Sequence, residues 1–205
     1  SILDQQFTDL ELLLVDDGST DGSGAICDEF AARDARVTAI HQKTPGSPPP
    51  ATMPWIWLGV YLQFLDSDDW ITPDATRSLV RAAEAHRCDL VIADFYRVVG
   101  ERLSRKGDID EDSPTREEYA AHMMEIHGLY YGVLWNKLYR RELVERYHLR
   151  MDPEISWCED FLFNLEYIRR AERFYALSVP IYYYVKTKGP WRPRAEHFQD
   201  GQDEA

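Results

Sequence analysis

The chain has 205 residues, a formal net charge of −13 and a hydrophobic content of 44%. These values suit a globular domain with a sizeable core and exclude a wholly disordered chain. The negative charge argues against a nucleic-acid backbone as partner, because such a partner needs a basic surface that releases counterions. The three cysteines (Cys27, Cys88 and Cys158) form neither a disulfide framework nor a zinc-binding pattern, so we expect a reducing cytoplasm.

The first part of the chain alternates between apolar runs and a helical pattern. Residues 1–7 are expected to be the tail of a helix, and residues 10–15 a buried strand. A turn rich in small polar residues then leads into a helix over 23–33, whose apolar residues fall on one side. Residues 37–40 and 60–63 are predicted to be two further short strands.

The later part of the chain continues this alternation. A helix is expected to begin at Thr72-Pro73, because proline suits the first helical position, and Thr115 to Glu118 have the spacing of a capping box. The other predicted elements are a buried strand over 88–96, a surface loop over 100–113, helices over 135–147 and 159–171, and a strand over 174–185. Strands alternating with helices of these lengths predict an α/β fold with a mostly parallel sheet.

No membrane-spanning or secretory segment is recognised in the sequence. The longest near-apolar stretch, residues 55–65, is too short to cross a bilayer.

Two acidic clusters each follow an apolar run that is typical of a strand. The first is Val15-Asp16-Asp17-Gly18-Ser19-Thr20-Asp21, and the second is Phe64-Leu65-Asp66-Ser67-Asp68-Asp69-Trp70. Carboxylates crowded at strand ends repel one another, so a fold tolerates them best with a cation or a polar ligand between them. Ligands of α/β sheets bind at the carboxyl ends of the strands. The clusters therefore predict one site for a metal ion and a phosphorylated substrate.

Four segments resemble the family 2 glycosyltransferases, most closely the bacterial branch that builds capsules, exopolysaccharides and lipopolysaccharide. They are the opening residues 1–11, the two acidic clusters, and Trp135-Asn136-Lys137-Leu138-Tyr139 with Glu159-Asp160 further on. The resemblance implies the Rossmann-like GT-A fold of nucleotide-diphospho-sugar transferases, here lacking its first strand. It also implies a nucleotide-sugar-binding part over residues 1–99, an acceptor-side part over 100–187 and a tail over 188–205.

The resemblance implies an enzyme that moves a sugar from a nucleotide-diphosphate donor, a UDP-sugar, to a hydroxyl of a glycan or a lipid-linked acceptor. The transfer is expected to invert the sugar's configuration and to serve cell-surface polysaccharide synthesis. A diphosphate leaving group needs charge neutralisation, which a divalent Mg²⁺ or Mn²⁺ ion supplies as a Lewis acid. Such an enzyme is expected in the cytoplasm, with peripheral contact to the inner face of the membrane and no nucleic-acid partner.

The family pattern also implies individual roles. Asp68 is expected to bind the metal directly, and Asp66 to help hold the metal and the ribose. The remaining donor-side residues would contact the base and the ribose or shape that loop; they are Asp16, Asp17, Ser19 and Asp21. The acceptor hydroxyl needs a base, which the family places on an acidic pair at a helix start; here that base is expected to be Asp160.

Structural roles stand beside these functional ones. Asp16 and Asp21 are suitable caps for the helix that follows, and Asp69 is a suitable cap for a turn. Glu159 and Asp160 form a first-turn pair that favours the helix dipole. Trp135 is expected to pack in the core. Lys137 is interpreted either as a surface lysine or as a phosphate contact.

Other functional classes stay open. Asp17-x-Ser19-x-Asp21-Gly22 with Asp28 approximates the calcium loop of an EF-hand, although a predicted strand, not a helix, precedes it. A nucleotidyltransferase also places metal-binding aspartates beside a nucleotide, but the basic glycine-rich loop that would mark it is not found in the sequence. A third alternative is an inactive remnant of a glycosyltransferase.

The chain departs from the family pattern in residues 43–60. This stretch contains five prolines (Pro45, Pro48, Pro49, Pro50 and Pro54), whereas the family has a helix of the form N-G-G-V-S-A-A-R-N. A shifted reading frame, which joins the third base of each codon to the first two bases of the next, can encode the amino-acid sequence of that helix. Met53-Pro54, for example, must then give Ala, and Trp55-Ile56 must give Asp. We interpret residues 43–60 as a frameshifted reading of a transferase gene, with a genuine proline-rich insertion as the alternative.

Two further departures lie toward the ends of the chain. The same shift over residues 188–194 yields a family-like sequence, so the tail to Ala205 is interpreted as non-native. The family's first strand, with its nucleotide-contacting loop, would precede Ser1, so the chain is expected to be a fragment. A sheet without a central strand exposes backbone groups and apolar faces, so this polypeptide is expected to be unstable or inactive.

Overall fold

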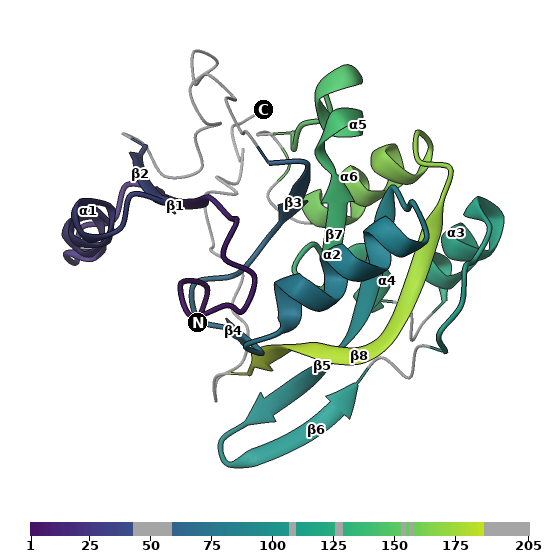
Figure 1. Cartoon of the computed structure of the whole chain (residues 1–205), viewed down its shortest axis with the longest axis horizontal. Coiled ribbons are helices and arrows are strands. Elements are labelled where there is room, and N and C mark those ends of the chain that lie inside the picture. The colour runs from purple at the N-terminus through teal and green to yellow at the C-terminus, as the bar shows by residue number, and fades with distance from the viewer. Residues whose placement is uncertain (43–58, 107–109, 126–128, 153–154, 156–157, 187–205) are drawn as a thin grey trace, which may run out of the picture.

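The computed structural model describes residues 1–42, 59–106, 110–125, 129–152, 155 and 158–186. Over these residues the chain forms an α/β fold with a two-stranded sheet and a six-stranded sheet (Figure 1). The predicted fold class is therefore confirmed in its α/β character. The proposed frameshifts, over residues 43–60 and in the tail after residue 187, fall almost wholly outside the described residues.

The two-stranded sheet consists of β1 (Leu12–Asp16) and β2 (Val37–His41), which run parallel and are joined by α1 (Ser23–Arg33). The bounds of α1 are those predicted from its helical spacing. In the register of the two strands, Asp16 lies opposite His41, so both side chains belong to the carboxyl end of the sheet.

The prediction of a buried strand over residues 10–15 is wrong. The residues of β1 before Asp16 are half-buried or exposed, and none of the residues of α1 is buried. Val15 and Ile26 are each 56% exposed. Among the described residues, β2 is the only strand that pairs with β1, so this small unit has little apolar surface against which to pack.

The six-stranded sheet contains the remaining strands in the order β3-β7-β5-β8-β4, with β6 paired to β5. These strands are β3 (Tyr61–Gln63), β4 (Trp70–Ile71), β5 (Leu90–Val99), β6 (Arg102–Lys106), β7 (Lys137–Arg140) and β8 (Phe174–Val185). Within this sheet only β5 and β8 run parallel, whereas all the other described pairs are antiparallel. The predicted mostly parallel order is thus replaced by a mixed sheet, partly because the tight turn at Gly100 folds β5 back into a hairpin with β6.

Helices cover both faces of this sheet around β5. Leu90 and Ile92 face one core, shared with α3 (Arg116–Met124) and α6 (Glu159–Ile168). Val91 and Ala93 face a second core, shared with α2 (Ala75–Ala85). All four of these strand residues are fully buried, which explains the unbroken apolar sequence Leu-Val-Ile-Ala. The remaining helices are α4 (Leu129–Gly132) and α5 (Arg141–Arg146).

Several predicted elements need correction. Residues 1–7 form turns, not a helix. Helix α2 begins at Ala75, not at Thr72-Pro73, because the Thr72 amide still donates to the Ile181 carbonyl of β8. The predicted helix over 135–147 is instead β7 followed by α5, and the predicted loop over 100–113 contains β6. The capping box is confirmed, because Thr115 and Glu118 bond reciprocally at the start of α3.

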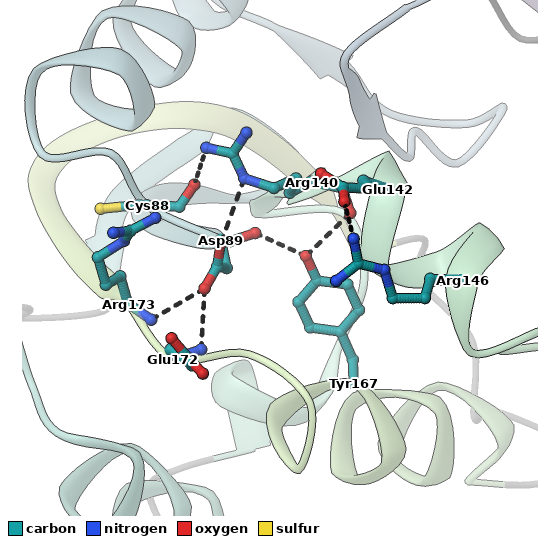
Figure 2. A network of polar contacts seen from close by, with 8 residues as sticks. All are labelled: Cys88, Asp89, Arg140, Glu142, Arg146, Tyr167, Glu172 and Arg173. Atoms are coloured by element: carbon teal, nitrogen blue, oxygen red, sulfur yellow. Dashed lines mark hydrogen bonds and ion pairs between the residues drawn. The ribbon is translucent and has the colours of Figure 1, made fainter.

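A polar network fastens the beginning of β5 to its neighbours (Figure 2). The Asp89 carboxylate accepts the backbone amides of Glu172 and Arg173 at 2.8 and 3.1 Å and pairs with the Arg140 guanidinium at 3.2 Å. The Tyr167 hydroxyl donates to the Asp89 carbonyl at 2.6 Å. Asp89 therefore joins β5, β7, α6 and the approach to β8.

Candidate active site

The first acidic cluster is organised around the buried carboxyl group of Asp16. One of its oxygens accepts the Ser19 amide at 3.0 Å, and the other lies 2.9 Å from Nδ1 of His41. These hydrogen bonds, led by those from Ser19 and His41, lower the pKa of Asp16 to about 2. The other ring nitrogen of His41, Nε2, lies 3.0 Å from an Asp28 carboxylate oxygen, and bonds to Asp16 and Asp28 raise the pKa of His41. Asp16 is therefore a fixed anion and not simply a helix cap.

The beginning of α1 approaches Asp16 closely. A Cβ atom on Gly24 would lie 2.6 Å from Oδ2 of Asp16, which is closer than such atoms approach in proteins. Glycine at this position lets the first turn of the helix pass beside the carboxylate.

The other predicted donor-side residues of this cluster, Asp17, Ser19 and Asp21, are exposed. Asp21 accepts the backbone amide of Ser23 at 3.1 Å and its hydroxyl at 2.6 Å, and these bonds lower the pKa of Asp21. Asp21 thus bonds the first residue of α1, although the N-cap of the helix is Gly22, and Asp17 and Ser19 face solvent on the same loop.

The second acidic cluster lies in the loop between β3 and β4. Asp69 is held on both oxygens: the Tyr182 hydroxyl donates to one at 2.7 Å, and the Val185 amide donates to the other at 2.7 Å. This fastening to β8 assigns Asp69 a structural role. As a whole residue Asp66 is exposed, but its carboxyl group is partly buried. This burial, together with the charges of Asp69 and Asp68, raises the pKa of Asp66 to about 6.

Asp160 lies in the first turn of α6, directly after Glu159. Burial raises the pKa of Asp160 to about 6, with smaller contributions from the charges of Glu159 and Asp66. The Lys137 ammonium group and a hydrogen bond from the Leu134 amide act in the opposite direction. Asp160 and Asp66 are distant in sequence, yet the charge of Asp66, in the β3–β4 loop, acts on Asp160 at the start of α6.

The structure thus unites some of the predicted residues and separates others. Asp66 and Asp68 lie in the β3–β4 loop, and the charge of Asp66 acts on Asp160 at the start of α6. The first cluster lies on the separate two-stranded sheet (Figure 1). Within the part of the chain that the structure describes, no group of three or more His, Cys, Asp or Glu side chains is arranged to hold a metal ion. The EF-hand alternative lacks its first helix, because β1 precedes this loop.

Sequence reasoning missed three neighbours of these carboxylates. His41 follows the predicted strand by one residue, and aligning the two parallel strand ends would have placed it beside Asp16. Tyr182 is one of several tyrosines in β8, and nothing in the sequence singles it out as the partner of Asp69. Lys137 is fully buried, so the surface alternative for this residue is wrong. Trp135 packs in the core as predicted, stacked on Tyr182 with ring centroids 4.5 Å apart.

Comparisons with known proteins show which family and fold the chain resembles. A curated relative, the uncharacterized glycosyltransferase EpsJ of Bacillus subtilis, is 35% identical over 211 residues, covering 97% of this chain and 61% of that protein. Glycosyltransferase GlyA of Streptococcus pneumoniae is 30% identical over 201 residues, covering 92% of this chain and 28% of that protein. The chain therefore spans less than two thirds of the length of these relatives.

A solved structure shows the same fold. Staphylococcus aureus TarS, determined in complex with UDP-GlcNAc, superposes with a TM-score of 0.74 at 22% identity, over 92% of this chain and 53% of that one. This likeness confirms the GT-A form of the α/β fold. Among the helices of the described residues, none has the length and apolar character needed to traverse a membrane. The family described as Glycosyl transferase family 2 matches residues 1–148, and the chain therefore belongs to this family.

Proposed function

We propose that the protein transfers a sugar from a nucleotide-diphosphate donor, a UDP-sugar, to a hydroxyl of a glycan or lipid-linked acceptor. The transfer inverts the sugar's configuration and serves cell-surface polysaccharide synthesis in the cytoplasm, at the inner face of the membrane. Family membership supports the reaction class. The UDP and UDP-GlcNAc complexes of the structurally similar TarS support the choice of a UDP-linked donor.

In this proposal the first acidic cluster holds the nucleoside. Asp16 and Asp17 accept hydrogen bonds from the base and the ribose, while Ser19 and Asp21 shape the loop. Asp16 is suited to this role because its low pKa keeps it an acceptor throughout the physiological range. Residues 1–99 form the donor part and 100–187 the acceptor part, with a non-native tail over 188–205.

A divalent Mg²⁺ or Mn²⁺ ion fits the second cluster. Asp68 and Asp66 would hold it, and it would supply charge neutralisation for the departing diphosphate. Two carboxylates suffice for such an ion because substrate phosphates and water complete its coordination. Burial is the main cause of the raised pKa of Asp66, and the charges of Asp69 and Asp68 add to it; a cation would relieve this second contribution, which supports the assignment.

Asp160 is the proposed catalytic base. Its carboxylate accepts the proton of the acceptor hydroxyl as the acceptor oxygen bonds to the anomeric carbon. The bond from that carbon to the donor phosphate breaks, and its electron pair leaves with the nucleoside diphosphate. A pKa of about 6 suits a base at neutral pH, because the group is ionised yet still basic.

The observation that carries the proposal is the interaction between Asp66 and Asp160. Asp66 lies in the β3–β4 loop and Asp160 at the start of α6, and the negative charge of Asp66 contributes to the raised pKa of Asp160, as expected where a donor and an acceptor would meet. The Asp89 carboxylate, by contrast, accepts two backbone amides and pairs with Arg140, so it serves the fold.

Calorimetry with UDP tests the donor site. UDP should bind in Mg²⁺ or Mn²⁺ and lose most of its affinity when EDTA removes the metal. Asp68→Ala should abolish this metal-dependent part, whereas Glu101→Ala, which removes a charge from the exposed β5–β6 turn, should not change it. Equal UDP affinity with and without metal in the wild type would refute the metal assignment.

The exposed apolar residues of the first unit support a second candidate, an inactive remnant of such an enzyme. Val15, Ile26 and Phe30 are 56%, 56% and 42% exposed, so the donor half of the site rests on a poorly packed unit. Release of UDP from UDP-sugars distinguishes the candidates. A remnant would bind UDP weakly and release none, whereas the enzyme would release UDP at a rate that Asp160→Asn lowers.

A further inference from the structure

Lys137 is a fully buried lysine at the start of β7. Removing an ammonium group from water costs several kcal/mol unless other groups compensate. Its Nζ donates to the Asn136 side-chain oxygen at 2.8 Å and to the Val133 carbonyl. Burial lowers the pKa of Lys137, and the carboxylate of Asp160 opposes this effect. The Lys137 side chain is therefore part of the protein interior, where the charge of the proposed base acts on it.

The segment that Lys137 holds also contacts the base. Residues 133–136 join α4 to β7, and the Leu134 amide in this segment donates to the Asp160 carboxyl group. Asn136, also fully buried, donates to the Ala93 carbonyl of β5 at 3.2 Å. Through Asn136, the ammonium group is thus tied to the central strand of the sheet.

Asn164 fixes the same segment from the side of α6. Its fully buried amide donates to the carbonyls of Gly132, Val133 and Asp160 at 2.9, 3.3 and 2.8 Å, and its oxygen accepts the Tyr139 hydroxyl at 2.9 Å. The Val133 carbonyl is consequently shared by Lys137 and Asn164.

The two elements also pack closely. A Cβ atom on Gly132 would lie 2.8 Å from the Phe161 ring, so only glycine allows this approach without a shift of the ring. The start of α6 and residues 132–136 therefore behave as one rigid support for the Asp160 side chain.

We propose that Lys137 is a positioning residue for the transfer reaction, whose buried ammonium group holds residues 133–136 through the Val133 carbonyl and the Asn136 side chain and supplies a positive charge that acts on the Asp160 carboxylate. This inference rests on the proposed role of Asp160 as the base. Among the residues that the structure describes, three charged side chains act on Asp160: Glu159 on its own helix, Asp66 from the β3–β4 loop and Lys137 from β7. Lys137 is the cation among them, so it counteracts the two carboxylates.

Titration of the Asp160 carboxyl group by NMR tests the charge coupling. The signal is assigned by its loss in Asp160→Asn. Lys137→Met keeps the length and apolar stem of the side chain but removes the charge, so the Asp160 midpoint should rise by about one pH unit or more. The matched control is Arg169→Met, which removes an exposed cation paired with Glu166 just after α6, and it should leave the midpoint unchanged.

A reciprocal measurement covers the case in which Lys137→Met does not fold. Coupling between two sites is mutual, so removing the Asp160 charge must lower the Lys137 midpoint by the same amount. Asp160→Asn is nearly isosteric at a half-buried position, and the Lys137 ammonium group is followed by ¹⁵N NMR. An unchanged partner midpoint in either folded variant would overturn the proposal.

Measurements of turnover distinguish a failure of the positioning role of Lys137 from a failure of the proposed transferase function. In Lys137→Met, the acidic limb of the kcat profile should move up by the same interval as the Asp160 midpoint, while KM for the UDP-sugar changes less than about twofold. A lysine with a merely structural role would lower the melting temperature without moving that limb. Absence of transfer by the wild type would refute the proposed function, whereas the mutual titration of Lys137 and Asp160 would still be measured.

Discussion

Replacing Tyr182 by phenylalanine should loosen the second acidic cluster from β8. The Tyr182 hydroxyl is fully buried and donates to the Asp69 carboxylate at 2.7 Å, and it also accepts the Asp66 amide at 3.2 Å. Phenylalanine keeps the ring that stacks on Trp135, so the change is confined to these two hydrogen bonds.

The expected loss of stability follows from the charge of the acceptor. A hydrogen bond to an ionised group contributes about 1.5–3 kcal/mol net. Asp66 is exposed, so its backbone amide can donate to water instead, and the loss of its hydrogen bond to Tyr182 adds little to the cost. Tyr182→Phe should therefore cost about 2 kcal/mol, equivalent to a fall of about 4–8 °C in the melting temperature for a protein of this size.

The loss should depend on pH in a defined direction. Burial raises the pKa of Asp69, so its ionised form is less favourable in the folded protein, and this unfavourable contribution fades as the pH falls through the raised pKa. The Tyr182 hydroxyl favours the ionised form. Its removal should raise the pKa of Asp69 further, so Tyr182→Phe should cost more at pH 8 than at pH 5.

Urea unfolding at the two pH values measures this difference. Tyr183→Phe is the matched control, because Tyr183 is the next residue of β8 and stacks instead on Trp70 and Tyr96. It should cost about 0.5 kcal/mol or less at either pH. A loss below about 0.5 kcal/mol for Tyr182→Phe at pH 8, or an equal loss at both pH values, would refute this reasoning.

Four other predictions concern the site, the fold and the gene. Turnover should fall as the pH drops below about 6, because protonated Asp160 cannot accept a proton, and Asp160→Asn should lower kcat at least about 100-fold without this acidic limb. Gly24→Ala should weaken UDP binding about tenfold in calorimetry, since its Cβ must displace the carboxylate of Asp16; unchanged affinity would contradict the donor role of that carboxylate. Asp89→Ala should cost about 3 kcal/mol or more in urea unfolding, because it breaks a nearly buried ion pair and strips two backbone amides of their acceptor. Resequencing the DNA of codons 43–60 should reveal a shifted frame, and an intact frame would establish the proline-rich segment as genuine.

Local signals in the sequence predicted the elements that depend on neighbouring residues. The helix over Ser23–Arg33 has its predicted bounds, and the capping box at Thr115 is formed as expected. In the segment 135–147 these local signals predicted the wrong element. Its apolar residues match a helical spacing, but Lys137 to Arg140 pair with both β3 and β5, and this pairing between distant strands outweighs local preference.

The polar side chains of residues 100–113 led to the wrong prediction of a surface loop over the whole segment. Arg102–Lys106 is a polar sequence, yet it forms a strand because β5 offers a free edge and because Arg105 pairs with the buried Asp94. For the site, the sequence located the carboxylates but not their partners. The interaction of Asp66 with Asp160 arises from the course of the whole chain, and short-range patterns carry no information about it.

The irregularity in the pairing of β5 with β8 has a consequence for cooperativity. Between the pairs Ala93–Leu177 and Phe95–Tyr182, β5 advances by two residues and β8 by five. The extra residues let β8 curve across the molecule, from the α3 side to β4 (Figure 1). One continuous strand thus begins at the Asp89 network and ends at the anchor of Asp69. Detachment of one end removes support from the pairing of the other, so a ligand that orders the acidic loop should slow amide hydrogen exchange at the far end of β8.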